Sequence, residues 1–101
     1  MRETLVETYL VRRVRELGGD TYKFTSPGRR HVADRLVIGT AGGRLVFVEC
    51  KRPGEKPRAG QLREHDRLRA RGFVVRVVAD KNEVDLLIGM LKLGAFFELA
   101  H

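Results

Sequence analysis

Two short apolar runs separated by a glycine-rich turn are the feature that most constrains how this chain can fold. The runs cover roughly residues 34–39 and 44–51, and the glycines between them are Gly39, Gly42 and Gly43. Apolar runs on either side of such a turn are typical of a β-hairpin. The hairpin brings the start of the first run and the end of the second together at its open end.

Three chemically active side chains lie near this open end. Asp34 begins the first run, and Glu49 and Lys51 close the second. Because successive side chains of a strand alternate between faces, Glu49 and Lys51 share one face and Cys50 points to the other. Two carboxylates and a lysine on rigid strands suit a divalent-metal site for phosphodiester hydrolysis.

Such hydrolysis needs an activated water, charge neutralisation on the phosphate and help for the leaving oxygen, and Mg²⁺ held by carboxylates can supply all three. Asp34 and Glu49 are the candidate ligands. The backbone carbonyl of Cys50 is a third, because hard cations also accept carbonyl oxygen. Lys51 could orient the water, stabilise negative charge or act as a base. The alternative for Glu49 and Lys51 is an ion pair on an exposed strand.

A carboxylate from the first predicted helix could join this group. Residues 2–17 carry an apolar stripe with a period of roughly 3.6 that stops at Gly18-Gly19. Glu7 lies near the boundary of the stripe, so it could reach the hairpin end directly or through water. Glu3 competes for the same role. The alternative for Glu7 is a solvated charge or an ion pair elsewhere.

The remaining pattern predicts one α/β domain over residues 1–101 with the element order α-β-β-β-α-β-α. The helix predicted over 58–71 has sparse apolar positions, Leu62 and Leu68, so we expect one of its faces to be exposed or bound to something. The tail over 93–99 is apolar enough either to fold back on the core or to cover a partner. The other predicted elements are a strand over 21–25, a buried strand over 73–79 and a helix over 80–91.

Composition favours a soluble protein with a polyanionic partner. The formal net charge is +7, from 20 Lys and Arg against 13 Asp and Glu, and nucleic acid is the common partner of such a surface. No apolar run is long enough to span a membrane and no secretory segment is visible, so we expect a cytoplasmic location. Basic residues flank the two acids: Arg29, Arg30, Arg52, Lys56 and Arg58.

These residues resemble a known nuclease signature. Asp34 followed by Glu49-Cys50-Lys51 is similar to the PD-(D/E)XK motif, and the predicted order matches the restriction-endonuclease-like core of that superfamily, a mixed central sheet flanked by helices. Residues 23–35 and 57–65 resemble the VRR-NUC family, the virus-type replication-repair nucleases. The resemblance covers roughly residues 3–90.

The resemblance implies a role for each site residue. Asp34 and Glu49 are metal ligands, Lys51 is the catalytic lysine, Glu7 fits the first-helix acid better than Glu3, and Gln61 fits a glutamine that points toward the site. Two positions depart from the family pattern. Ala33 replaces the usual proline and contributes no ligand, and His31 stands where glycine is common and could touch a phosphate.

The activity implied by the resemblance is Mg²⁺- or Mn²⁺-dependent DNA endonuclease activity, selective for DNA structure. Small members of the family resemble junction-resolving enzymes in acting as homodimers, which implies four-way or branched DNA as substrate. The family itself suggests a phage or prophage origin. The alternative is a non-catalytic nucleic-acid-binding module on the same scaffold. A third reading, an interaction subunit that docks a replication protein through its apolar tail, is compatible with either.

Overall fold

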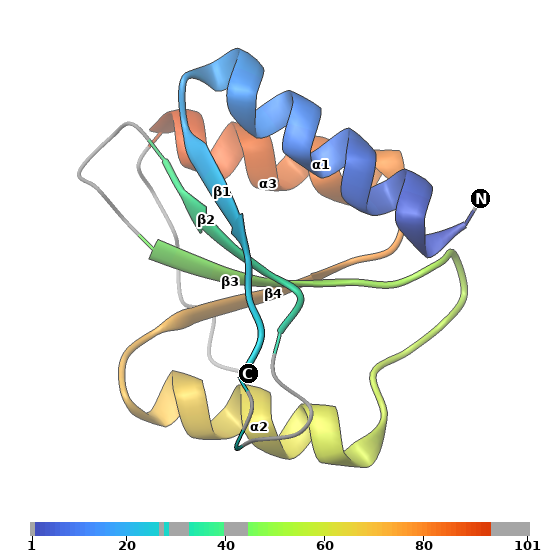
Figure 1. The fold of residues 1–101 in the computed structure, drawn as a ribbon, viewed down its shortest axis with the longest axis vertical. Coiled ribbons are helices and arrows are strands. Elements are labelled where there is room, and N and C mark those ends of the chain that lie inside the picture. The colour runs from blue at the N-terminus through green and yellow to red at the C-terminus, as the bar shows by residue number, and fades with distance from the viewer. Residues whose placement is uncertain (1, 27, 29–32, 40–44, 94–101) are drawn as a thin grey trace.

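The computed structural model describes residues 2–26, 28, 33–39 and 45–93, and these residues have the predicted α-β-β-β-α-β-α order (Figure 1). The turn expected over 40–44 and most of the apolar tail lie outside the described residues. The elements are α1 (Glu3–Leu17), β1 (Asp20–Lys23), β2 (Arg35–Ile38), β3 (Leu45–Cys50), α2 (Ala59–Ala70), β4 (Val74–Val78) and α3 (Lys81–Leu93).

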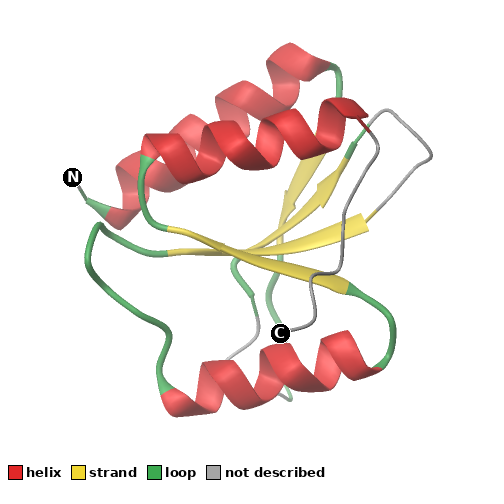
Figure 2. Ribbon diagram, turned by 180° about the vertical axis from the view of Figure 1, so that it is seen from behind, coloured by secondary structure: helices red, strands yellow, loops and turns green. Residues whose placement is uncertain are grey.

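The strands form one mixed sheet in the order β1-β2-β3-β4. β1 pairs with β2 and β2 with β3 in antiparallel fashion, whereas β3 and β4 run parallel. α1 and α3 lie side by side over one face of the sheet, and α2 covers the other face (Figures 1 and 2). The predicted mixed sheet flanked by helices is therefore confirmed.

α1 forms because its apolar stripe faces the sheet, with Val6, Leu10 and Val14 fully buried. The helix ends at Gly18, whose φ of 88° is a left-handed conformation that glycine adopts without steric cost. Gly19 follows because the chain passes close to β2: a Cβ atom there would lie 2.5 Å from the Ile38 carbonyl oxygen. This tight exit leads directly from α1 into β1.

The sheet has an apolar core on each face. The larger core joins α1, α3 and alternate residues of the central strands, among them Val46, Val48 and Cys50. The smaller core under α2 holds Phe47, which makes an edge-to-face contact with Phe24 at a centroid distance of 5.7 Å. Each fully buried Val, Leu or Phe contributes about 1.5–3 kcal/mol to stability. Cys50 lies in the larger core, whereas Glu49 contacts α2 on the other face, so the predicted alternation along β3 is correct.

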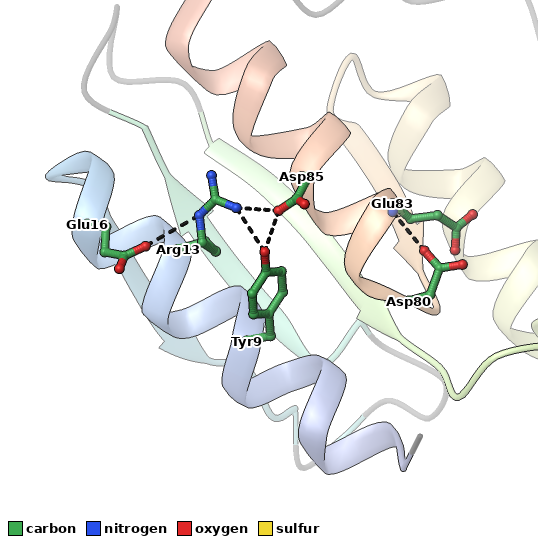
Figure 3. Close-up of polar contacts among 6 residues, drawn as sticks. All are labelled: Tyr9, Arg13, Glu16, Asp80, Glu83 and Asp85. Carbon is green, nitrogen blue, oxygen red and sulfur yellow. Dashed lines mark hydrogen bonds and ion pairs between the residues drawn. The ribbon is translucent and has the colours of Figure 1, made fainter.

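A polar cluster holds α1 against α3 (Figure 3). The Tyr9 hydroxyl donates to Asp85 Oδ1 at 2.7 Å, and Arg13 donates to the same hydroxyl at 2.9 Å and also to Asp85. In the first turn of α3 the backbone N–H of Glu83 donates to Asp80 at 2.8 Å, which caps the helix. The position of α1 relative to the sheet is thus fixed by α3 as well as by its own apolar stripe.

Helix α2 has an exposed face, as expected, and an inner face that is largely polar. Its buried residues are Glu64, His65 and Leu68, whereas Leu62 is 47% exposed. Apolar spacing missed this inner face because two of its three buried side chains are ionisable. No helix among the described residues is both long and apolar enough to cross a membrane.

Candidate active site

Asp34 and Glu49 face each other at the open end of the β2–β3 hairpin. β2 begins at Arg35, which pairs with Val48, so continuing the register by one residue places Asp34 opposite Glu49. Asp34 stands at a bend just before the strand, and its Oδ2 accepts the backbone N–H of Cys50 at 2.7 Å. The structure therefore brings together the two acids that the sequence placed there.

The Cys50 backbone points toward the same acids. The N–H and C=O of one strand residue face the same side, and neighbouring residues face opposite sides. The N–H of Cys50 faces Asp34, whereas the N–H of Lys51 donates to the Val78 carbonyl oxygen on β4 at 2.9 Å. The Cys50 carbonyl is thus directed toward the Asp34 side.

Glu49 is almost completely buried, with 2% exposure. Its Oε2 accepts a hydrogen bond from Gln61 Nε2 at 3.0 Å and lies 3.6 Å from the Lys51 ammonium. Its Oε1 is buried without a hydrogen-bond partner in the described part of the chain. An ionised carboxylate in such a place requires nearby positive charge, and Lys51 supplies one part of it.

Negative charge accumulates around Asp34. Burial first, and then repulsion from Glu49, Glu3 and Glu7, raises the pKa of Asp34 to about 6, although the hydrogen bond from Cys50 opposes the rise. The Cys50 thiol lies in the core, where burial and then the Asp34 carboxylate raise its pKa. Glu3 and Glu7 are therefore both close enough to act electrostatically on the hairpin end.

Glu7 itself is engaged in ion pairs. Its Oε2 accepts a hydrogen bond from Arg35 at 2.7 Å and another from Lys23 at 3.1 Å. Burial alone raises the pKa of Glu7, but these two cations outweigh burial and lower it. Of the two candidate helix acids, Glu7 is therefore held in place by two cations, whereas Glu3 is exposed to solvent.

Gln61 reaches the site because it opens α2. Its Oε1 accepts the backbone N–H of the N-cap residue Arg58 at 2.9 Å, and its Nε2 donates to Glu49. This matches the position that the resemblance implied for Gln61. One turn further along α2, His65 places Nε2 3.5 Å from Glu49 Oε1. In the sequence, only the four-residue spacing of His65 from Gln61 could have indicated this contact.

The basic residues expected to hold DNA are only partly described. Arg52 lies 3.6 Å from Glu55, and Lys56 and Arg58 are exposed on the loop between β3 and α2. Arg29, Arg30 and His31 lie outside the described residues. A hollow of about 590 Å³ separates this loop from the start of α1 and is lined by Arg2, Glu3, Thr4, Leu5, Arg52 and Glu55.

The donor set fits a hard divalent cation. In the described ranges no group of three or more His, Cys, Asp or Glu side chains is placed to hold a metal ion. The candidate set is instead two carboxylates and one carbonyl, which are oxygen ligands of the kind that Mg²⁺ and Mn²⁺ prefer. A buried Glu49 oxygen without a hydrogen bond and a carboxylate cluster that raises the pKa of Asp34 both match a cation at this point.

The fold and its carboxylate-lysine cluster define a nuclease domain of the restriction-endonuclease type. A solved structure described as "VRR_NUC domain" matches with a TM-score of 0.80 and 42% identity, over 86% of this chain and 94% of the other. The "Putative nuclease p44" of Acyrthosiphon pisum secondary endosymbiont phage 1 is 51% identical over 88 residues, which are 87% of this chain and 92% of that protein. No family model matches the chain. The chain belongs to the VRR-NUC family of nucleases.

Proposed function

We propose that this nuclease is a metal-dependent DNA endonuclease whose cation is held by Asp34, Glu49 and the Cys50 carbonyl. The observation that carries the proposal is the position of Asp34 opposite a buried Glu49 whose Oε1 accepts no hydrogen bond from the described residues. Bound Mg²⁺ or Mn²⁺ supplies an activated water and neutralises charge on the phosphate. The protein's own contribution is to fix these oxygens on a hairpin before DNA arrives.

The other site residues act on the water, the phosphate or the ligands. Lys51 is the catalytic lysine, because its nearly buried ammonium lies 3.6 Å from Glu49 Oε2, beside the proposed metal site. It can orient the water or stabilise negative charge on the phosphate oxygens. Gln61 holds Glu49 through a direct hydrogen bond. Glu7 is the first-helix acid, held toward the hairpin by Arg35 and Lys23.

DNA lies along the basic edge that surrounds the acids. Arg52, Lys56 and Arg58 follow Lys51 directly, and Arg29, Arg30 and His31 precede Asp34 in the sequence. Contacts from these residues to phosphates position the backbone without reading base sequence. The hollow between α1 and the loop after β3 offers room for the strand beside the site.

The substrate is branched DNA, cut by a two-fold homodimer. A two-fold dimer presents two sites to opposed strands, which suits paired nicking of a symmetric junction. Exposed apolar side chains at Leu86 and Leu93, both on α3, provide surface that a second copy can bury. Light scattering should give twice the monomer mass, and a stable monomer with full four-way activity would refute the dimer.

The direct test is cleavage of labelled linear, flap and four-way DNA with Mg²⁺, Mn²⁺ or EDTA. Asp34→Asn and Glu49→Gln keep the side-chain shape but remove a charge that the cation requires, so both should abolish cutting while the fold remains intact. Asp66→Asn is the matched control, because Asp66 is a 76% exposed acid on α2. Wild-type cutting by Asp34→Asn or Glu49→Gln rejects the metal site. Salt-sensitive DNA binding without cutting by the wild-type protein indicates a binding module instead.

A further inference from the structure

We propose that His65 is a positioning residue that fixes the Glu49 carboxylate from inside the protein. The inference rests on the proposed role of Glu49 as a metal ligand. His65 has no exposed surface, so it touches neither solvent nor DNA directly. Any effect that it has on the reaction must pass through a neighbour, and the neighbour that its Nε2 faces is Glu49 Oε1, 3.5 Å away.

The unpartnered polar atoms of the two side chains match each other. Both ring nitrogens of His65 and the Oε1 of Glu49 are buried without a hydrogen bond among the described residues. A neutral imidazole always carries one N–H donor and one acceptor nitrogen, and a carboxylate only accepts. A shift of roughly 0.5 Å would bring Nε2 and Oε1 into the ordinary range for an N–H···O bond. The movement would pair Nε2 with Oε1 and leave the second lone pair of Oε1 for a cation. Nδ1 would remain without a partner among the described residues.

Glu49 needs such a second contact. The last side-chain torsion of glutamate is broad, so a single hydrogen bond leaves the carboxyl group free to rotate. Gln61 holds Oε2 at 3.0 Å, and His65 faces the other oxygen from the same helix. Residues four apart lie above one another on one helix face, so α2 contacts both oxygens at once. Together the two contacts set the plane of the carboxylate before a cation binds.

The test compares His65→Phe, which keeps a ring of similar size without a donor, with His65→Gln, which keeps an N–H donor. We expect His65→Phe to bind Mn²⁺ about 10- to 100-fold more weakly by calorimetry on DNA-free protein, the usual effect of losing a residue that orients a ligand. Its kcat should fall to a similar extent, while KM for DNA stays within about two-fold. His65→Gln should recover most of both losses.

Leu68→Met is the matched control, since Leu68 is another buried residue on the same face of α2. It changes packing without touching Glu49, so Mn²⁺ affinity should stay at the wild-type value. Wild-type affinity and kcat in His65→Phe would overturn the inference. So would equal losses in His65→Phe and His65→Gln, because they would mean that His65 serves packing alone.

A nitrogen NMR measurement of the His65 ring separates this inference from the proposed function. In the metal-free wild-type protein we expect a proton on Nε2, the nitrogen that faces Glu49. A ring protonated only on Nδ1 would turn a lone pair toward the carboxylate and refute the positioning role, whether or not the protein cuts DNA. If the wild-type protein neither binds Mn²⁺ nor cuts DNA, the proposed function fails, and the Nε2 proton still decides the His65–Glu49 contact. The same spectrum decides the inference if His65→Phe fails to fold.

Discussion

Gln61 joins the first turn of α2 to the carboxylate of Glu49. Its Oε1 accepts the Arg58 backbone N–H at 2.9 Å, and its Nε2 donates to Glu49 Oε2 at 3.0 Å. Only the carbonyl end of the amide can accept the first bond, so the NH₂ group must face Glu49. The start of a helix thus determines how an acid on the neighbouring strand is held.

The raised pKa of Asp34 predicts a pH dependence of stability in the metal-free protein. Burial, and then the neighbouring carboxylates, raises this pKa from 3.8 to about 6. The folded state therefore binds the proton more tightly than the unfolded state, and the resulting stability is present below about pH 4 and lost as the pH rises through about 6. Thermal unfolding in EDTA should show a higher midpoint at about pH 5 than at about pH 7.

Asp34→Asn should remove most of this pH-dependent gain, because the asparagine does not titrate. The lowered pKa of Glu7 has the opposite effect on stability, because the ionised Glu7 stabilises the folded state. That contribution is lost only as the pH falls below the ordinary glutamate pKa of 4.5. An unchanged difference between the two pH values in Asp34→Asn would mean that another group is responsible.

Loss of the Lys51 ammonium should slow turnover more than it weakens DNA binding. Lys51→Met keeps most of the nearly buried side chain and removes the charge beside Glu49. We expect kcat to fall by about 10²-fold or more, the scale typical of losing an acid–base or charge-stabilising group. Lys92→Met, at an exposed position on α3 outside the proposed DNA path, is the control. Parallel losses of DNA affinity and rate in Lys51→Met would mean that Lys51 is only a phosphate contact.

Two arginines at opposite ends of α2 test where DNA lies. Arg58 is the N-cap residue beside Gln61, and Arg71 is the C-cap residue, more than two helical turns away. Each phosphate contact contributes about one unit to the slope of log affinity against log salt. Arg58→Ala should therefore flatten the slope by about one unit, and Arg71→Ala should leave it unchanged. The reverse result would place the DNA at the far end of α2.

The same measurement tests the basic residues before Asp34. Joint neutralisation of Arg29 and Arg30 should flatten the salt slope by about two units, because two phosphate contacts are lost. A slope equal to that of the wild-type protein would exclude both residues from the DNA path.

Glu7 and Glu3 can be separated by measuring stability and cutting together. Glu7→Gln removes the partner of Arg35 and Lys23, so it should lower both the rate of cutting and the unfolding free energy, the latter by about 1 kcal/mol. Glu3→Gln should change neither, because Glu3 is exposed at the start of α1. A normal rate in Glu7→Gln and a slow one in Glu3→Gln would assign the helix acid to Glu3.

Local pattern was sufficient for the strands that carry the site. Strand alternation separated Cys50 from Glu49, and the hairpin register brought Asp34 opposite Glu49 although Asp34 lies one residue outside β2. These predictions succeeded because the two-residue period of a strand and the pairing of two successive strands depend on residues close together in the sequence.

Packing between layers could not be predicted in the same way. The contact of His65 with Glu49 joins a helix to a strand across the smaller core, and no apolar period marks it. The polar inner face of α2 could not be predicted for the same reason, since hydrophobic spacing cannot detect buried Glu64 and His65. An ion pair was one of the alternatives for Glu7, but its partner could not be named from the sequence, because Arg35 comes from a different element.

The parallel pairing of β3 with β4 sets the order in which the site can be completed during synthesis. The Lys51 backbone donates to Val78 on β4, and Asp85 on α3 holds the helix that carries Glu7. A ribosome releases the acids of the site well before these two supports, and a single domain folds as a unit once its chain is available. A chain that is still being synthesised therefore carries the acids before β4 and α3 are available to hold them in place. We expect such an incomplete chain to lack the assembled site, even when it lies near nucleic acid.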